Sequence, residues 1–167
     1  MPIYTRRGDG GWSTTLAGDR VLKNHPVLEA CGDLDELNAA LGLVRTRPVE
    51  KARWPRLAET LLAVQKDLLA LGAYVSSGDR MHLEPLAFQP QDFEALIDEL
   101  LAGRRLSGFV LPGHSGPEAA LHMARAVCRR CERRLAAVIR TRPDARVRKY
   151  LNRLSDLLFA LAVWVSD

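Results

Sequence analysis

The stretch Ala124–Arg134 constrains the fold of this chain more than any other part of the sequence. It holds five arginines and one glutamate within about three helical turns. At 100° per residue its apolar and charged side chains fall on separate stripes. The apolar stripe comprises Leu121, Ala124, Cys128, Cys131, Leu135 and Val138; the charged stripe beside it comprises Glu118, His122, Arg125, Arg129 and Glu132; Arg130 and Arg134 lie near the back. The pattern predicts a helix that is buried along one side.

The charged stripe borders the buried face, so its arginines need anionic partners. An unpaired charge at such a position is costly. We expect Arg125 and Arg129 to meet either a polyphosphate ligand or a carboxylate from another helix or subunit.

Apolar residues recur at the helical period in four further segments. The predicted helices span residues 26–46, 50–76, 90–103, 116 to about 141, and about 144 to the end. Residues 1–25 are glycine-rich and aperiodic, with a short extended piece at Ile3–Tyr4 as the expected exception. Five helices with short connections predict an all-α bundle in a single domain, 1–167, with an irregular N-terminal segment.

The chain has a net charge of +4, concentrated in one region. Residues 125–153 carry eleven Lys and Arg against Glu132 and Asp144. Such an excess indicates a phosphate-bearing ligand, and the scarcity of aromatic residues there favours a small nucleotide over nucleic acid. No apolar stretch suits a transmembrane helix and the first residues lack a signal-peptide core, so we expect a cytoplasmic protein with no membrane partner.

The segment Thr5–Thr15 contains three glycines, two arginines and several hydroxyl side chains. Exposed glycine amides suit an anion, although a flexible terminus has the same composition. Polar or small residues also follow stripes on two helices, namely Gly32, Asp35, Ala39 and Gly42 on the first and Arg148, Asn152 and Ser155 on the last. These stripes indicate a site or an oligomer interface, and the simpler alternative is a set of solvated faces.

Catalytic side chains are scarce. The four histidines do not have the spacing of metal ligands, no Ser–His–Asp arrangement stands out, and the pair Cys128 and Cys131 lies on an apolar stripe, as packing cysteines do. An enzyme with this sequence is expected to work by positioning and electrostatics.

Five motifs in order make the chain resemble the PduO-type ATP:cob(I)alamin adenosyltransferases. They are Tyr4–Thr14, Cys31–Asn38, Phe109–Gly113, Ala124–Arg133 and Leu151–Asp156. The resemblance implies a five-helix bundle that forms a homotrimer, with ATP and Mg²⁺ bound between neighbouring subunits. It implies that Thr5, Arg6, Arg7, Gly8, Ser13 and Lys23 of one subunit and Arg129, Arg130, Glu132, Arg133 and Asn152 of the next surround the nucleotide.

Within that implied site Arg129 is the main triphosphate contact, and Asp35 pairs with Arg125 across the subunit interface. The implied reaction transfers the 5′-deoxyadenosyl group of ATP to the cobalt of reduced cobalamin and releases triphosphate. Cobalt is the nucleophile, which explains why the protein lacks one. Phe109 is implied to lie near the corrinoid and to help remove its lower axial ligand.

The sequence departs from the family pattern at several places. Cys31 replaces a tyrosine, Val27 an arginine, His114 a glycine and Gly10 a lysine or aspartate, and the chain ends soon after the last motif. These differences bear on corrinoid affinity and on the loop near His114. The alternative function is a non-catalytic ATP- or corrinoid-binding carrier or sensor. Handover of the corrinoid to a cobalamin-dependent mutase is compatible with both the enzyme and the carrier. A basic module that binds nucleic acid is the least favoured hypothesis.

Overall fold

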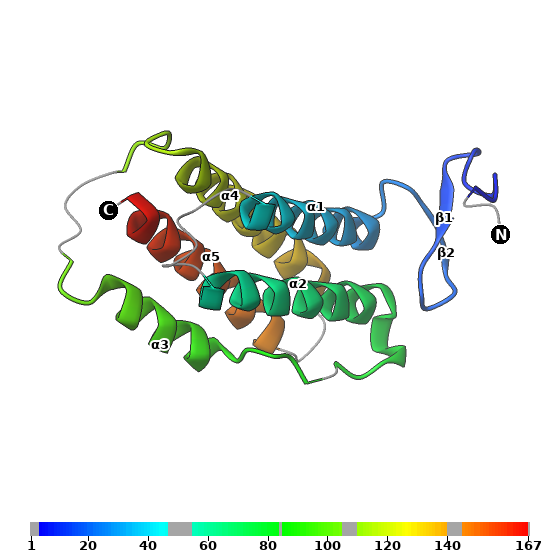
Figure 1. Ribbon diagram of the computed structural model, residues 1–167. Coiled ribbons are helices and arrows are strands. Elements are labelled where there is room, and N and C mark those ends of the chain that lie inside the picture. The colour runs from blue at the N-terminus through cyan, green and yellow to red at the C-terminus, as the bar shows by residue number, and fades with distance from the viewer. Residues whose placement is uncertain (1–3, 47–54, 84, 105–109, 140–144, 167) are drawn as a thin grey trace.

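In the computed structural model, five α-helices form a bundle and a small β-hairpin stands at one end of it (Figure 1). The structure describes residues 4–46, 55–83, 85–104, 110–139 and 145–166. The helices are α1 (Pro26–Thr46), α2 (Pro55–Ser76), α3 (Pro90–Leu101), α4 (Gly116–Val138) and α5 (Ala145–Ser166), with a short 3₁₀ helix at Gly78–Arg80. The predicted all-α bundle of five helices is confirmed.

The helices begin at local capping signals. Ser115 precedes α4 and its hydroxyl accepts the amide of Glu118 at 3.3 Å, which satisfies one of the unpaired donors of the first turn. At α3 the side chain of Asp92 accepts the amide of Gln89 at 2.7 Å, and Pro90 occupies the first turn. Gly103 follows α3 with φ +74°, a conformation that favours glycine and ends the helix two residues before the predicted boundary.

Leucines of α1, α2, α4 and α5 are the most frequent residues of the core. Helix α4 packs against α1 and α5, α1 packs against α2, and α3 packs against α5. The apolar stripe predicted for α4 is buried from Leu121 to Leu135, and Val138 is partly buried against the same core. The helical period therefore identified the buried face of this helix correctly.

A buried carboxylate ties three parts of the bundle together. Asp67 of α2 accepts the amides of Ala87 and Phe88 at 2.7 and 3.2 Å, and the hydroxyl of Tyr150 of α5 donates to it at 2.9 Å. Burial and the neighbouring Asp67 raise the pKa of Tyr150, so its hydroxyl remains a donor. These bonds hold the segment before α3 in place.

The N-terminal segment contains a hairpin that the sequence did not predict. Strands β1 (Trp12–Thr14) and β2 (Arg20–Leu22) pair antiparallel, with Ser13 opposite Val21. Three-residue strands are too short to show an alternating pattern. Of the expected extended piece, Tyr4 is not in a strand and Ile3 lies outside the described residues, as do residues 50–54, 140–141 and 144 of the predicted helices.

The hairpin is attached to the end of α2. The amides of Leu16 and Ala17 donate to the hydroxyl and carbonyl oxygens of Ser76 at 3.0 and 3.1 Å. Along the described part of the chain, no helix combines the length and the apolar character needed to cross a bilayer.

Candidate functional site

The N-terminal segment forms a hollow of about 680 Å³, within the range of small-molecule sites. Its lining comprises Thr5, Arg7, Gly8, Trp12, Ser13, Thr14, Arg20 and Lys23. Five of the six N-terminal residues predicted to bind a nucleotide thus line one hollow. The exception is Arg6, whose guanidinium lies 5.6 Å from the centre of the Tyr4 ring.

Gly8 lies close to the Lys23 side chain in this hollow. A Cβ on Gly8 would lie 3.1 Å from Lys23 Nζ and 3.2 Å from its Cε. A side chain at Gly8 would therefore displace the lysine by a few tenths of an ångström. The amide of Lys23 also donates to the carbonyl of Gly11 at 3.0 Å, and Gly11 has φ +80°. Glycines set the shape of the backbone around this cation.

Arg20 is a lining residue that sequence reasoning missed. Its guanidinium lies 5.0 Å from the centre of the Trp12 ring, across the hairpin. The hairpin places Arg20 opposite Thr14, so this cation enters the hollow because the strands pair. Only a prediction of the hairpin could have indicated it.

The arginines of α4 separate into two groups by their partners. Arg130 Nε lies 3.1 Å from Asp33 Oδ1 and also bonds Glu36, and Arg134 Nη1 lies 2.5 Å from Glu29 Oε2. The hydrogen bonds that Arg130 donates, chiefly to Glu36 and also to Asp33, raise its pKa. Both arginines, predicted to lie near the back of the helix, are thus paired with carboxylates of α1.

The second group has no carboxylate partner among the described residues. Arg129 and Arg133 are exposed, and Arg133 Nη1 donates to the backbone carbonyl of Arg129 at 2.9 Å. Arg125 lies 5.8 Å from the centre of the Phe159 ring, and its buried Nε lacks a hydrogen-bond acceptor within the described part of the chain. Arg125, Arg129 and Arg133 are therefore the cations of α4 that remain available to an anion.

A second hollow, of about 360 Å³, lies where α3, α4 and α5 meet. It contains two of the predicted residues, Glu132 and Asn152, joined by a 3.0 Å bond from Asn152 Nδ2 to Glu132 Oε1. The rest of its lining is Pro90, Gln91, Glu94, Arg148, Lys149 and Arg153. It shares no residue with the N-terminal hollow, so the predicted site residues fall into two separate groups in one chain.

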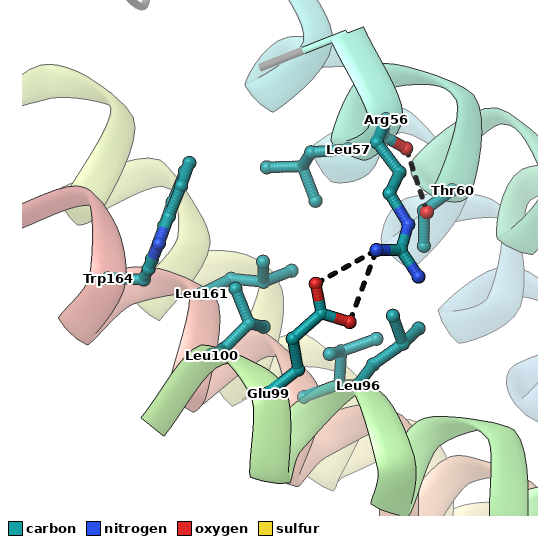
Figure 2. A pocket seen from close by; sticks show the side chains of 9 residues that line it. Arg56, Leu57, Thr60, Leu96, Glu99, Leu100, Leu161 and Trp164 are labelled. Atoms are coloured by element: carbon teal, nitrogen blue, oxygen red, sulfur yellow. Dashed lines mark hydrogen bonds and ion pairs between the residues drawn. The ribbon is translucent and has the colours of Figure 1, made fainter. Parts of the chain in front are cut away.

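A third hollow, of about 160 Å³, lies between α2, α3 and α5 (Figure 2). Leucines and Trp164 line it, and Arg56 of α2 reaches across to Glu99 of α3 at 2.9 Å. None of the residues predicted from the sequence lies in its wall.

Asp35 is exposed on α1, and within the described residues no cation pairs with it. Gly32 and Ala39 of the same predicted stripe are also exposed, and Gly42 is partly so. The predicted partner of Asp35, Arg125, likewise has no carboxylate in its own chain across the described ranges. Phe109 lies outside the described residues.

The two cysteines of α4 are buried. The thiol of Cys128 donates to the carbonyl of Leu151 at 3.3 Å. Burial raises the pKa of both thiols, that of Cys131 to about 12, so both stay protonated at neutral pH. A buried, protonated thiol packs as a small apolar group.

The fold and these hollows define a class: a helical-bundle protein with a cationic surface suited to phosphate. A family model described as cobalamin adenosyltransferase matches residues 3–165. The chain belongs to the cobalamin adenosyltransferase family.

Known relatives agree with this assignment. The chain is 42% identical over 168 residues to a cobalamin adenosyltransferase of Cupriavidus metallidurans, covering 96% of this chain and 85% of that protein. It is 40% identical over 169 residues to the corrinoid adenosyltransferase MMAB of Mus musculus, covering 96% and 70%.

A solved structure has the same fold. A variant of the PduO-type ATP:corrinoid adenosyltransferase from Lactobacillus reuteri, complexed with cobalamin and ATP, superposes with a TM-score of 0.89 at 28% identity. The match covers 99% of this chain and 93% of that one.

Proposed function

We propose that this chain is an ATP:corrinoid adenosyltransferase. It transfers the 5′-deoxyadenosyl group of ATP to the cobalt of cob(I)alamin and releases triphosphate. The observation that carries the proposal is the N-terminal hollow, where Lys23 and four other residues expected to bind the nucleotide lie together. The family membership and the neighbour complexed with cobalamin and ATP support it.

The protein's part in the reaction is to bind ATP and to activate its triphosphate as the leaving group. The reduced cobalt is the substrate nucleophile; its bond to the ribose C5′ carbon forms as the bond from C5′ to the triphosphate oxygen breaks. Negative charge grows on the triphosphate, and the side chains of Arg7, Lys23 and Arg129 stabilise it. Mg²⁺ accompanies ATP as part of the co-substrate. Fixed alignment of the two substrates supplies the rest of the acceleration.

The active site is shared between subunits of a homotrimer. In this arrangement Arg6, Thr5, Gly8 and Ser13 hold the nucleotide from one subunit, and Arg129 of the next is the main triphosphate contact. The support is that the two hollows are separate in one chain while Arg129 and Arg133 lack carboxylate partners among the described residues. Glu132, Arg133 and Asn152 complete the pocket; Arg130 joins them only if it shares its guanidinium with the acids of α1.

The pair Asp35 and Arg125 is proposed to join neighbouring subunits. Asp35 is exposed beside Gly32 and Ala39, whose small side chains allow another backbone to approach. Arg125 carries a buried Nε without an acceptor in the described chain. Asp35 of a second subunit would accept a hydrogen bond from Arg125 Nε. The close approach of that subunit would explain the small residues beside Asp35.

The corrinoid is proposed to lie near Phe109, which helps to displace the lower axial ligand. The adjacent described residues Val110 and Leu111 are exposed and apolar, as a corrinoid contact requires. We assign residues 1–167 to one domain, place the protein in the cytoplasm, and expect its product to pass to a cobalamin-dependent mutase.

One assay tests the proposed function. The protein is mixed with ATP, Mg²⁺ and chemically reduced cobalamin without oxygen, and the visible spectrum is followed for adenosylcobalamin. We expect product in proportion to enzyme, with triphosphate released. Binding of both ligands without product contradicts the proposal and supports the alternative, a carrier or sensor of the same fold.

A further inference from the structure

The first turn of α4 contains a fully buried carboxylate that the proposed reaction does not use. Glu118 is 0% exposed, and its Oε2 accepts the amides of Gly113 and His114 at 2.8 and 3.0 Å. These two amides belong to the loop that precedes α4. The positive end of the helix dipole favours a negative charge at this position. The carboxylate thus links the loop directly to the helix.

His122 stands one turn further along the helix, against the same carboxylate. It is 5% exposed, its Nε2 lies 3.0 Å from Glu118 Oε1, and its ring meets that of Phe159 of α5 edge-on at 6.1 Å. Despite this short contact, Glu118 Oε1 and both ring nitrogens of His122 are buried and have no hydrogen-bond partner within the described residues. Burial lowers the pKa of His122, and Arg125 lowers it further while Glu118 opposes the change.

The buried pair of Glu118 and His122 lowers the stability of the fold. Burying polar atoms without full hydrogen bonding destabilises a fold, and an apolar pair would fill the same space at lower cost. A plain N-terminal cap needs no second buried polar residue, and the cap of α4 is already supplied by Ser115. The arrangement therefore has a purpose other than starting the helix.

The loop held by Glu118 presents apolar side chains to solvent. Val110 is 42% exposed and Leu111 is 88% exposed. Gly113 has φ +121°, which turns its amide and the next one toward a single carboxylate oxygen. An exposed apolar surface on a loop with a fixed base suits a large apolar substrate.

We infer that Glu118 is a positioning residue for the corrinoid: its carboxylate fixes the loop 110–113 so that Val110 and Leu111 contact the corrin ring, while His122 lies against the other carboxylate oxygen at 3.0 Å. The inference rests on the proposed function. It adds to that function two residues inside the bundle that touch neither substrate. ATP binding is separate, because neither Glu118 nor His122 lines the N-terminal hollow.

The test compares three variants by steady-state kinetics of adenosylcobalamin formation. Glu118→Ala removes both acceptor oxygens; we expect the KM for cobalamin to rise about tenfold or more, as for loss of hydrogen bonds to a charged group. The KM for ATP should stay within about twofold. Glu118→Gln keeps one oxygen for the two amides and should restore the KM for cobalamin to within about threefold. Ser115→Ala is the matched control, because it removes a cap bond of the same turn and leaves the carboxylate in place.

A measurement on the wild-type protein covers the case in which Glu118→Ala does not fold. Amide hydrogen exchange at Gly113 and His114 should be slow although the loop is exposed, and fast exchange at both overturns the inference. With an active wild type, an unchanged KM for cobalamin in Glu118→Ala, or equal rises for both substrates, also overturns it. A wild type that makes no adenosylcobalamin refutes the proposed function instead, and the exchange data then still decide whether Glu118 holds the loop.

Discussion

Replacing Arg129 by alanine should separate binding of the triphosphate from stability of the fold. Arg129 is exposed, and its guanidinium has no carboxylate partner in the described part of the chain. Its removal should change the free energy of unfolding by less than about 0.5 kcal/mol. A hydrogen bond between charged groups contributes about 1.5–3 kcal/mol, and each 1.4 kcal/mol is about tenfold. We therefore expect kcat/KM for ATP to fall about 10- to 150-fold.

Arg134→Ala is the matched control on the same helix. Arg134 is comparably accessible, at 43% exposure of its side chain, but it pairs with Glu29 and Asp33 of α1. Its loss should lower the free energy of unfolding by less than about 1 kcal/mol and leave kcat/KM within about twofold. Both variants are assayed by the initial rate of adenosylcobalamin formation at varied ATP, with urea unfolding alongside. Equal turnover in Arg129→Ala and the wild type refutes the assignment.

Three further predictions concern the interior. Tyr150→Phe removes the hydroxyl that donates to Asp67 and should lower the free energy of unfolding by about 1–2 kcal/mol in urea titrations; an unchanged midpoint contradicts this. Burial lowers the pKa of His122 in the folded protein. As the pH falls below about 6.5, His122 is therefore protonated more readily in the unfolded chain than in the folded one. Wild-type stability should therefore decline as pH falls below that value, and His122→Gln should reduce the decline; parallel pH profiles count against it. Cys128 and Cys131 should react with a thiol reagent only after unfolding, and rapid labelling of either residue in the native protein at pH 7, located by peptide mapping apart from the partly buried Cys31, contradicts their buried, protonated state.

The sequence predicted those features that depend on one helix at a time. The apolar stripe of α4 repeats every three or four residues, so the buried positions of Leu121 and Cys128 followed from period alone. The grouping of Thr5, Gly8 and Lys23 came from resemblance to a family, and the structure places them around one hollow.

Features that depend on neighbours in space could not be predicted in this way. Arg129 and Arg130 are adjacent in sequence and equal in chemistry, yet only Arg130 meets the acids of α1. Arg20 enters the N-terminal hollow through a hairpin whose strands are three residues long. Glu118 belonged to a charged stripe, and its bonds to a preceding loop depend on how that loop turns back at Gly113.

Coexpression of two defective subunits tests most directly whether one active site is built from two chains. Lys23→Ala removes a cation of the N-terminal hollow and Arg129→Ala removes one of α4, so each variant alone should keep no more than about a tenth of the wild-type activity. When equal amounts of the two variants assemble at random into trimers, a subunit with an intact Lys23 faces a subunit with an intact Arg129 at about a quarter of the interfaces. We predict about a quarter of wild-type activity from the mixture, and activity no higher than that of the separate variants contradicts a shared site.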